Sequence, residues 1–385
     1  MTDALDMKLL TDTSSARFPI EITAAVAKSP KSPFVLETVS LSAPRPDEVL
    51  VRLVATGMCH TDLAGRDAEL PVALPAVLGH EGAGIVEMVG ANVTYVEPGD
   101  HVVLGYLTCG ACPECEAGEP SACANFGALC FGGARSDGSH VLCGQDGSVL
   151  SDRFFGQSSF APFAVVSERS LVRVRKDAPL ALLGPLGCGV TTGAGTVWNA
   201  LKVSPGSAFA VFGAGAVGLS AAMAAKVAGA STIICIDRVR SRLDLALEIG
   251  ATHVIDASAG DVGEAIRAII GTGLDAALDT TGRGDVIATA FSALAQRGAL
   301  ACVASSEAGG EHRLDVMGLI MGSKRIMGVV EGGSSPRQMI PKLIDLHLQG
   351  RFPFDRLTRF YELDQINEAA DDSLTGKVIK PILKF

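Results

Sequence analysis

Between residues 208 and 303 the sequence alternates short apolar segments with longer segments of helical periodicity, and this alternation limits the fold more than any other feature. Apolar runs such as AFAVF, STIICID and LDAALD are followed by helix-like runs such as AVGLSAAMAAKVAG and GDVIATAFSALAQ. Strands and helices that alternate at this spacing form a parallel, doubly wound sheet. We therefore predict an α/β fold with a Rossmann-type sheet in this part of the chain.

The first turn of this region carries three glycines in G-x-G-x-x-G spacing, between a predicted strand and a predicted helix. Gly213 permits the tight turn, Gly215 leaves room for a pyrophosphate at the helix N-terminus, and Gly218 allows close helix–strand packing. The next strand ends at Asp237, whose carboxylate can accept hydrogen bonds from ribose hydroxyls and would repel a 2′-phosphate. We therefore predict NAD as the cofactor, while the adjacent Arg238 leaves NADP as the alternative.

Four of the ten cysteines crowd into one segment in the order C-x2-C-x2-C-x7-C. They are Cys109, Cys112, Cys115 and Cys123. Four thiolates at this spacing can close a tetrahedral shell around Zn²⁺ with no open position, which is typical of a structural site. An iron–sulfur cluster also takes four cysteines and is the alternative.

Composition excludes several classes of function. The chain has 32 basic and 42 acidic residues, a net charge of −10 and no basic run, which disfavours nucleic acid and anionic membranes as partners. Residues 178–201 and 203–225 carry no charge, but Gly, Pro and Thr interrupt both, so we expect buried α/β core there and no membrane span. The first residues lack the apolar segment of a secretory signal, and we expect a cytoplasmic protein.

The remaining sequence divides into three parts. Residues 20–105 contain short alternating strands between Pro and Gly turns, which predicts a mostly β unit. Residues 106–140 are rich in Cys and Gly and are predicted to be a loop. After residue 330, two helical segments and a closing strand, KVIKPILKF, are expected.

Three further residues stand in Gly-containing turns: Cys59 in GMCHTD, His80 in LGHEGAG and Cys188 in GPLGCGVTTG. A single Cys or His is more often a core residue than a ligand. Two cysteines and one histidine together, however, form a known catalytic zinc ligand set that leaves the fourth position for water or substrate.

With these motifs in place, the chain resembles the zinc-dependent medium-chain alcohol dehydrogenases from about residue 20 to residue 385. GHEGAG, GDHV, the four-cysteine segment, GCGVTTG, GAGAVG and GKVIK carry the resemblance. FFGQSSFA, GPLGCG and FGAGAVGLSA make the chain most similar to the aryl- (benzyl-) alcohol dehydrogenase branch. The resemblance implies a GroES-like catalytic domain over residues 1–189, to which residues 331–385 return, and an NAD-binding Rossmann domain over residues 190–330. It also implies a homodimer or a homotetramer.

The resemblance further implies roles for the residues around the catalytic zinc, which Cys59, His80 and Cys188 would bind. Glu81 would lie behind the ion as a transient ligand. Thr61 would take the proton of the alcohol. Asp62 would orient the histidine ligand.

Other matching residues would contact the cofactor and the substrate. The expected cofactor contacts are His60 and Lys380 at the pyrophosphate, Thr192 and Val217 at the nicotinamide, and Asp237 and Arg242 at the adenosine ribose. Phe154 would wall the substrate pocket, with Phe155 and Tyr106 as further candidates. Many members of the family carry a His at the position of Ala64, so the resemblance leaves the end of the proton relay beyond Thr61 open.

The activity implied by the resemblance is oxidation of a primary aromatic or allylic alcohol, such as benzyl alcohol, to the aldehyde by NAD, with two Zn²⁺ per chain. A glutathione-dependent formaldehyde dehydrogenase would use the same kinds of zinc and NAD residues and is one alternative. A non-catalytic NAD-binding protein on the same fold is the other. The sequence gives no role to four cysteines, for which burial is expected. They are Cys130, Cys143, Cys235 and Cys302.

Overall fold

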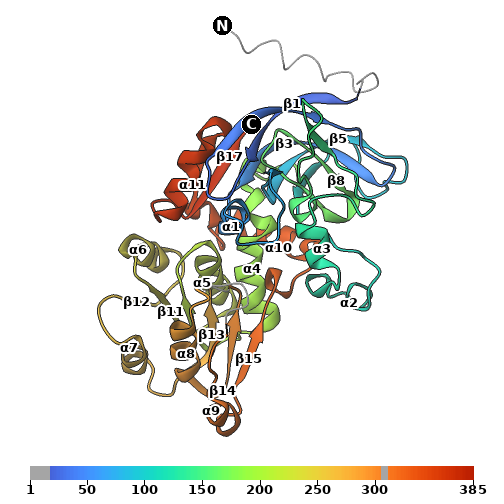
Figure 1. Ribbon diagram of the computed structural model, residues 1–385. Helices are drawn as coiled ribbons and strands as arrows, with labels where there is room; N and C mark the ends of the chain where they lie inside the picture. The colour runs from blue at the N-terminus through green and yellow to red at the C-terminus, as the bar shows by residue number, and fades with distance from the viewer. Residues whose placement is uncertain (1–17, 305–310) are drawn as a thin grey trace.

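The computed structural model describes residues 18–304 and 311–385 and arranges them around three sheets (Figure 1). Residues 1–17, which include most of the N-terminal segment considered above, lie outside the described part. No helix in the two described ranges combines the length and the apolar character that crossing a bilayer requires.

Six parallel strands form the sheet in the lower half of Figure 1. They are β10 (Ala208–Phe212), β11 (Thr232–Asp237), β12 (His253–Asp256), β13 (Leu274–Asp279), β14 (Leu294–Cys302) and β15 (Arg325–Gly328). Their order across the sheet is β12-β11-β10-β13-β14-β15, so the order along the chain reverses between β10 and β13. This is the Rossmann arrangement, and ligands of such sheets bind at the carboxyl ends of the strands where the order reverses. The predicted α/β fold is confirmed.

Helices connect these strands. They are α5 (Ala216–Ala228), α6 (Arg240–Ile249), α7 (Val262–Ile269), α8 (Gly284–Ser292) and α9 (Val316–Met321). Helix α8 is shorter than the sequence predicts, because the segment GDVIATAFSALAQ does not remain helical to its end. Leu294 instead begins β14 and is buried opposite Leu274 of β13.

A seven-stranded sheet organises the other part of the chain. Its strands are β3 (Glu48–Gly57), β5 (Glu81–Val89), β6 (His101–Leu104), β8 (Phe163–Ser167), β9 (Leu171–Val174), β16 (Thr358–Glu362) and β17 (Lys380–Lys384). The order is β16-β17-β3-β5-β6-β9, and β8 also pairs with β3. Because β17 pairs antiparallel with β3, the chain after the Rossmann sheet returns to the first part of the structure. The domain limits at residues 189 and 330 stay a prediction.

A smaller sheet and several short helices complete the fold. The four strands, in the order β4-β1-β2-β7, are β1 (Ile20–Ala27), β2 (Phe34–Leu41), β4 (Ala76–Val77) and β7 (Leu142–Gly144). The α-helices are α1 (His60–Arg66), α2 (Pro113–Glu116), α3 (Phe126–Phe131), α4 (Gly189–Gly195), α10 (Pro336–Leu348) and α11 (Ile366–Leu374). The 3₁₀ turns are η3 (Pro120–Ala122), η4 (Phe154–Gly156), η5 (Glu168–Ser170), η6 (Leu180–Leu182), η7 (Gly184–Gly187), η9 (Glu331–Gly333), η10 (Phe354–Leu357) and η11 (Leu363–Gln365), and η8 (Thr196–Ala200) is a π-turn.

The prediction of a plain loop over residues 106–140 is wrong, because α2, η3 and α3 fall within it. Pro113 occupies the first position of α2, where its missing N–H costs no hydrogen bond. Helix α3 carries Phe126 and Phe131, whose rings pack against Phe155. Packing of the apolar residues at the two ends of α3 thus explains this helix, which the Cys and Gly content of the segment does not predict.

Helix α4 lies directly on the first helix of the Rossmann sheet. A Cβ atom added at Gly193 would lie 2.1 Å from the Val217 carbonyl oxygen at the start of α5. One added at Gly195 would lie 2.5 Å from the carbonyl oxygen of Gly332 in η9. Only glycine permits these close approaches. Helix α4 therefore joins the two halves of the molecule, one around the Rossmann sheet and one around the seven-stranded sheet, by backbone contact.

A buried ionic network fixes the segment after the four cysteines to β3. Arg135 donates two hydrogen bonds of 2.8 Å to the Glu48 carboxylate, and Arg153 adds one of 3.3 Å. The three side chains are 4–7% exposed. Burial by itself raises the pKa of Glu48, but the two guanidinium groups and a backbone hydrogen bond from Arg45 outweigh burial and lower it.

We predict that Glu48→Gln lowers the free energy of unfolding by about 3 kcal/mol, because it leaves two buried guanidinium groups without a counter-charge. Urea denaturation followed by circular dichroism measures the change. Glu87→Gln is the matched control. It breaks the pair with Arg52, whose side chain is 44% exposed, and should cost less than about 1 kcal/mol. Equal, small losses in both variants would show that the network adds no stability.

Candidate active site

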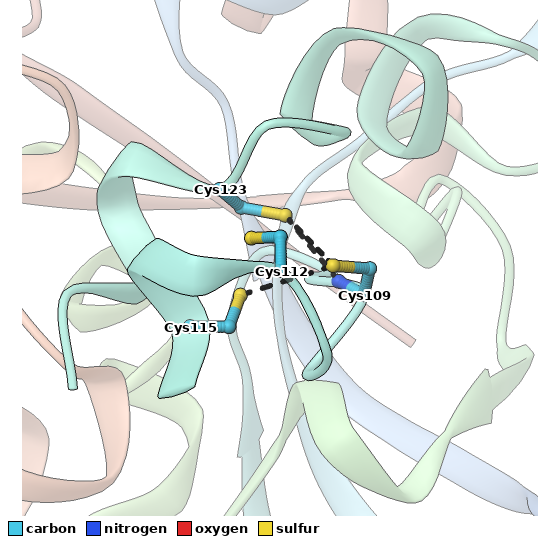
Figure 2. Close-up of side chains that lie close together, drawn as sticks. All are labelled: Cys109, Cys112, Cys115 and Cys123. Carbon is cyan, nitrogen blue, oxygen red and sulfur yellow. Dashed lines mark hydrogen bonds between the residues drawn. The ribbon is translucent and has the colours of Figure 1, made fainter. Parts of the chain in front are cut away.

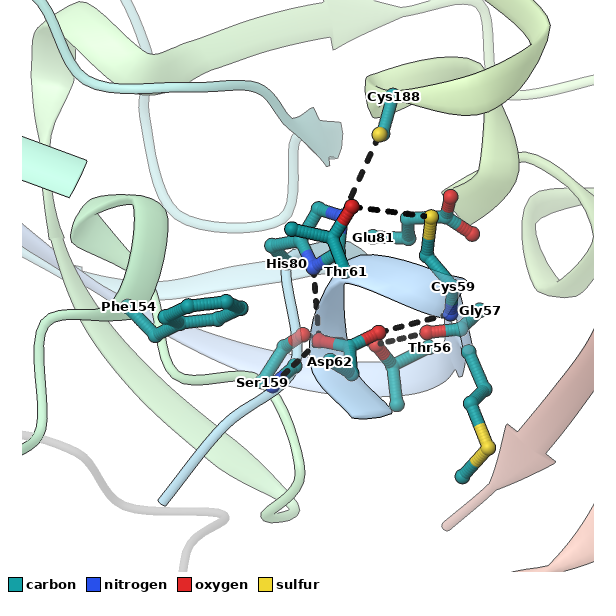
Figure 3. A network of polar contacts seen from close by, with 12 residues as sticks. Thr56, Gly57, Cys59, Thr61, Asp62, His80, Glu81, Phe154, Ser159 and Cys188 are labelled. Carbon is teal, nitrogen blue, oxygen red and sulfur yellow. Dashed lines mark hydrogen bonds and ion pairs between the residues drawn. The ribbon is translucent and has the colours of Figure 1, made fainter. Parts of the chain in front are cut away.

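The Asp62 carboxylate positions two of the candidate metal ligands, Cys59 and His80 (Figure 3). Cys59 precedes α1, and its backbone N–H donates to Asp62 Oδ2 at 2.8 Å. Asp62 Oδ1 lies 2.7 Å from His80 Nδ1 and accepts from the Gly79 N–H at 3.1 Å. A proton on Nδ1 that bonds to this carboxylate leaves the Nε2 lone pair free for a metal.

The structure brings together four side chains from three distant segments. Cys59 lies at the start of α1, His80 and Glu81 at the start of β5, and Cys188 at the start of α4. One ligand atom of each lies within 4.8 Å of the others, and His80 Nε2 lies 3.3 Å from Cys188 Sγ. Two thiols and an imidazole are ligands that zinc prefers.

The two thiols of this cluster differ in acidity. A hydrogen bond from Cys188 lowers the pKa of Cys59 well below its ordinary value, and the charge of Lys380 adds to the effect. The same hydrogen bond, together with burial, raises the pKa of Cys188 well above its ordinary value. Two thiolates this close repel each other unless a cation lies between them. The residues present therefore fit a zinc ion.

Glu81 forms a buried ion pair on the far side of the cluster. Lys380 Nζ lies 2.7 Å and 3.0 Å from its two carboxylate oxygens and 3.2 Å from the Met58 carbonyl oxygen. Burial raises the pKa of Glu81, and the charge of Lys380 opposes the rise. The structure thus directs the Lys380 ammonium toward Glu81, and its contact with a pyrophosphate stays a prediction.

A buried amide that the sequence analysis did not assign supports the histidine from the other side. Gln157 donates from Nε2 to the His80 carbonyl oxygen at 2.9 Å and accepts from the Gly82 N–H at 3.1 Å. Gln157 therefore fixes the backbone on both sides of Glu81. Its place in the motif FFGQSSFA was the only sequence signal.

An aromatic wall lies beside the histidine. The Phe155 ring stacks on His80 with centroids 4.4 Å apart, and the Phe154 ring meets it edge-on at 5.5 Å. Phe126 and Phe131 of α3 lie 6.0 Å and 5.4 Å from Phe155. Phe126 and Phe131 were not predicted from the sequence, because the Cys and Gly content of their segment indicates a loop.

Tyr106, the third predicted pocket residue, uses its hydroxyl group to connect the two halves of the structure. The hydroxyl donates to the Ser334 carbonyl oxygen at 2.5 Å, and the ring lies 5.5 Å from Phe126. Tyr106 thereby ties the aromatic wall to the segment that follows β15.

The four cysteines of the second cluster converge (Figure 2). All four sulfur atoms lie within 4.8 Å of one another, and Cys109 Sγ is 3.5 Å from Cys123 Sγ and 4.0 Å from Cys115 Sγ. Tetrahedral Zn–S bonds place sulfurs about 3.8 Å apart. An iron–sulfur cluster needs room for several iron and sulfide atoms, which this spacing does not provide. The donor set therefore fits one zinc ion.

The thiols of this cluster also differ in acidity. Hydrogen bonds from the Ala111 backbone and the Asn125 side chain lower the pKa of Cys109 to about 6. Partial burial, together with hydrogen bonds to the neighbouring thiols, raises the pKa of Cys115 to about 12. Without a metal, these groups would not all be ionised at neutral pH.

The glycine turn after β10 has the geometry expected of a dinucleotide site. Gly213 has φ +99°, and a Cβ atom at Gly218 would lie 1.8 Å from the carbonyl oxygen of Gly213. Gly215 has no neighbouring atom within 4 Å of a Cβ position, so its backbone is open to a ligand. Asp237 Oδ2 accepts from the Ala214 N–H at 2.7 Å and thereby braces the turn.

The predicted nicotinamide contacts lie beside the metal cluster. Thr192 is on α4, and the helix begins at Gly189, whose Cβ position would be 3.8 Å from a Val217 methyl group and 3.8 Å from Glu81. The reactive end of a dinucleotide bound at the turn would therefore meet the metal ligands.

Three further predicted residues lie around this region. Arg242 Nη1 is 3.9 Å from Asp237 Oδ2, and the contact of both residues with the adenosine ribose stays a prediction. His60 is exposed at the start of α1. Thr61 Oγ1 lies 3.7 Å from Cys59 Sγ, next to the candidate zinc ligands (Figure 3).

Comparisons with known proteins agree with this geometry. Residues 45–176 match the family described as "Alcohol dehydrogenase GroES-like domain" and residues 216–349 match "Zinc-binding dehydrogenase". A geraniol dehydrogenase of Castellaniella defragrans is 45% identical over 368 residues, which are 95% of this chain and 98% of that protein. The chain belongs to the zinc-dependent medium-chain alcohol dehydrogenase family.

Two solved structures extend the similarity of this alcohol dehydrogenase to the whole fold. The benzyl alcohol dehydrogenase of Acinetobacter calcoaceticus is 50% identical with a TM-score of 0.92, and the match covers 95% of this chain and 99% of that one. An alcohol dehydrogenase zinc-binding domain protein of Burkholderia ambifaria is 55% identical with a TM-score of 0.94, at the same coverage. The GroES-like domain and the Rossmann domain of this alcohol dehydrogenase are therefore established.

We predict that each of the two clusters of this alcohol dehydrogenase holds one zinc ion, and that loss of the two ions has different effects on stability and turnover. Cys112→Ala should lose one zinc equivalent and lower Tm by at least about 5 °C, because a structural ion contributes directly to folding. Cys188→Ala should lose the other zinc equivalent and abolish turnover, but it should retain dinucleotide binding. Metal analysis, calorimetry and steady-state assays measure these effects.

Cys143→Ala, outside both clusters, is the control and should leave metal content and turnover unchanged. The distinction between the two sites would be lost if Cys112→Ala and Cys188→Ala changed stability and turnover alike.

Proposed function

We propose that this alcohol dehydrogenase oxidises primary aromatic or allylic alcohols, such as benzyl alcohol, to aldehydes, with NAD as the hydride acceptor and two Zn²⁺ per chain. The observation that carries the proposal is the aromatic wall beside His80, because flat apolar rings at the metal cluster favour an unsaturated or aromatic substrate. The names of the geraniol and benzyl alcohol dehydrogenases support the same substrate class.

The chain's own residues would prepare the site for this reaction. Cys59, His80 and Cys188 would hold the catalytic zinc, and Asp62 keeps the histidine in the tautomer that can bind it. Bound zinc would polarise the alcohol oxygen, and the nicotinamide would supply the hydride-accepting carbon. The phenylalanine rings exclude water and orient the alcohol for the transfer.

Proton removal would begin at Thr61 Oγ1, which lies next to the candidate ligands. The following turn of α1 carries Ala64, so this chain provides no imidazole there to receive the proton. The proton would continue from the threonine hydroxyl through the ribose hydroxyls to water.

We further propose that the protein forms a homodimer or homotetramer. Four large apolar side chains of α9 are 56–72% exposed. They are Val316, Met317, Ile320 and Met321. They follow β14 and precede β15, the edge strand of the parallel sheet, whose unpaired backbone could bind the strand of another copy.

A substrate panel tests the proposed function. With NAD, we expect kcat/KM for benzyl and cinnamyl alcohol to exceed that for 1-propanol by about 100-fold. Burial of an apolar ring of this size in the pocket stabilises the bound state by about that factor. Phe155→Ala should reduce the ratio, and Phe360→Ala, a half-exposed ring on β16, is the control.

Two results would contradict the proposal. Formaldehyde turnover that depends on glutathione, with no activity toward benzyl alcohol, would favour the glutathione-dependent formaldehyde dehydrogenase. No turnover of any alcohol by zinc-loaded protein that binds NAD would favour a non-catalytic protein.

The cofactor preference depends on Asp237. Asp237→Asn should reduce the preference for NAD over NADP at least about tenfold, because it removes the charge that repels a 2′-phosphate while keeping an oxygen for the Ala214 N–H. The ratio of kcat/KM for the two cofactors measures the effect. Asp256→Asn, which removes the same charge at the end of the neighbouring strand β12, should leave the ratio unchanged. A wild-type enzyme that prefers NADP would assign the selectivity to Arg238.

A further inference from the structure

Glu331 is a buried acid for which the sequence analysis gave no role. It begins η9, shortly after the edge strand β15 ends at Gly328, at the carboxyl end of the parallel sheet where ligands of such sheets bind. The residue is 7% exposed and its backbone has φ +48°, which side-chain-bearing residues rarely adopt. Unusual backbone conformations of this kind persist only where the surroundings impose them, and they concentrate at functional sites.

The surroundings of η9 do impose its conformation. Gly332 is pressed against α4, where a Cβ atom would lie 2.6 Å from the Thr191 carbonyl oxygen. Asn199 Nδ2 donates to the Gly333 carbonyl oxygen at 3.1 Å, and Tyr106 donates to that of Ser334. These contacts therefore fix the backbone of η9, the turn that carries Glu331.

The neighbouring Gly332 brings η9 against the α4 residue expected at the nicotinamide, because a Cβ atom at Gly332 would lie 3.0 Å from the Thr192 carbonyl oxygen. Thr192 belongs to α4, the helix that begins directly after the candidate metal ligand Cys188. Burial raises the pKa of Tyr106, and the charge of Glu331 adds to it. The turn η9 and the residue after it thus contact Tyr106 of the aromatic wall on one side and α4 at Thr192 on the other.

The chain leaves this carboxylate incompletely paired. Within the described residues, Glu331 Oε2 has no hydrogen-bond partner, and no Lys or Arg forms an ion pair with the group. Burial raises its pKa to about 7, which reflects how little counter-charge the chain supplies. An unpaired buried carboxylate is costly, so a bound group that is not part of the chain would stabilise it.

Two cationic groups would come near this position when the enzyme is loaded. The zinc ion already has its own set of ligands in Cys59, His80 and Cys188, with Glu81 behind them. The other is the nicotinamide ring, which would lie against Thr192 and is positively charged only in its oxidised form. The close approach of η9 to Thr192 favours the ring.

We propose that the Glu331 carboxylate contacts the nicotinamide end of the bound dinucleotide and favours its oxidised, positively charged form over the reduced, neutral form. The inference rests on the proposed use of NAD and adds a residue that sets the relative affinity for the two redox states. Glu331 would thereby bias the enzyme toward binding NAD⁺ and releasing NADH, which suits alcohol oxidation.

Dissociation constants of NAD⁺ and NADH for the zinc-loaded enzyme, measured by isothermal titration calorimetry, test the proposal. Glu331→Gln keeps the shape of the side chain and removes its charge. We expect it to weaken NAD⁺ binding about tenfold, as loss of a charged contact does, and to change NADH binding less than about twofold. Glu331→Asp, which keeps the charge, should retain more of the wild-type ratio of the two constants.

Glu248→Gln is the matched control, because it removes the same charge from an exposed position on α6, where the carboxylate pairs with Arg356. It should leave both constants unchanged. A variant that merely damages the site would weaken both forms of the cofactor equally, and that result, or no change in either constant, would overturn the role of Glu331. A wild-type enzyme that binds neither dinucleotide would refute the proposed function itself.

Discussion

The fully buried carboxylate of Asp62 sets the geometry on which the site depends. It accepts hydrogen bonds from the backbone before α1 and from the backbone before β5, and it holds the ring nitrogen of His80. A buried carboxylate is stable only when its oxygens are satisfied, so the two segments must meet in this one arrangement. Cys59 and His80 are thereby fixed relative to each other before any metal binds, and Gln157 fixes the backbone on the other side.

The third ligand, Cys188, depends on contact between the two halves of the molecule. It begins α4, which packs on α5 through Gly193 and on η9 through Gly195. Larger side chains at these positions would separate the helix from the Rossmann sheet. The same backbone contacts that place the thiol therefore place Thr192 and the glycine turn of the cofactor site, so the metal site and the cofactor site are positioned together.

Much of this arrangement could be predicted from the sequence. The strands and helices of the Rossmann sheet follow from regular alternation, and the candidate ligands follow from motifs whose residue types match zinc chemistry. Three features could not be predicted, because they arise from tertiary packing. Helix α3 owes its place to phenylalanines that only the folded wall brings together, Lys380 is directed to Glu81 by burial, and single polar residues such as Gln157 and Glu331 give no signal of burial in the sequence.

The return of β17 to β3 has a consequence for the order in which the protein folds during synthesis. All strands of the Rossmann sheet have been made once residue 328 has left the ribosome, and the sheet forms from neighbouring β–α units. The catalytic sheet begins earlier in the chain, and β8 pairs with residues 48–52 of β3, but residues 55–57 of β3 lack their partner until residues 380–384 emerge. This part of the β3 edge therefore stays open while the strands of the Rossmann sheet are made, and during that interval it is exposed to wrong strand pairing.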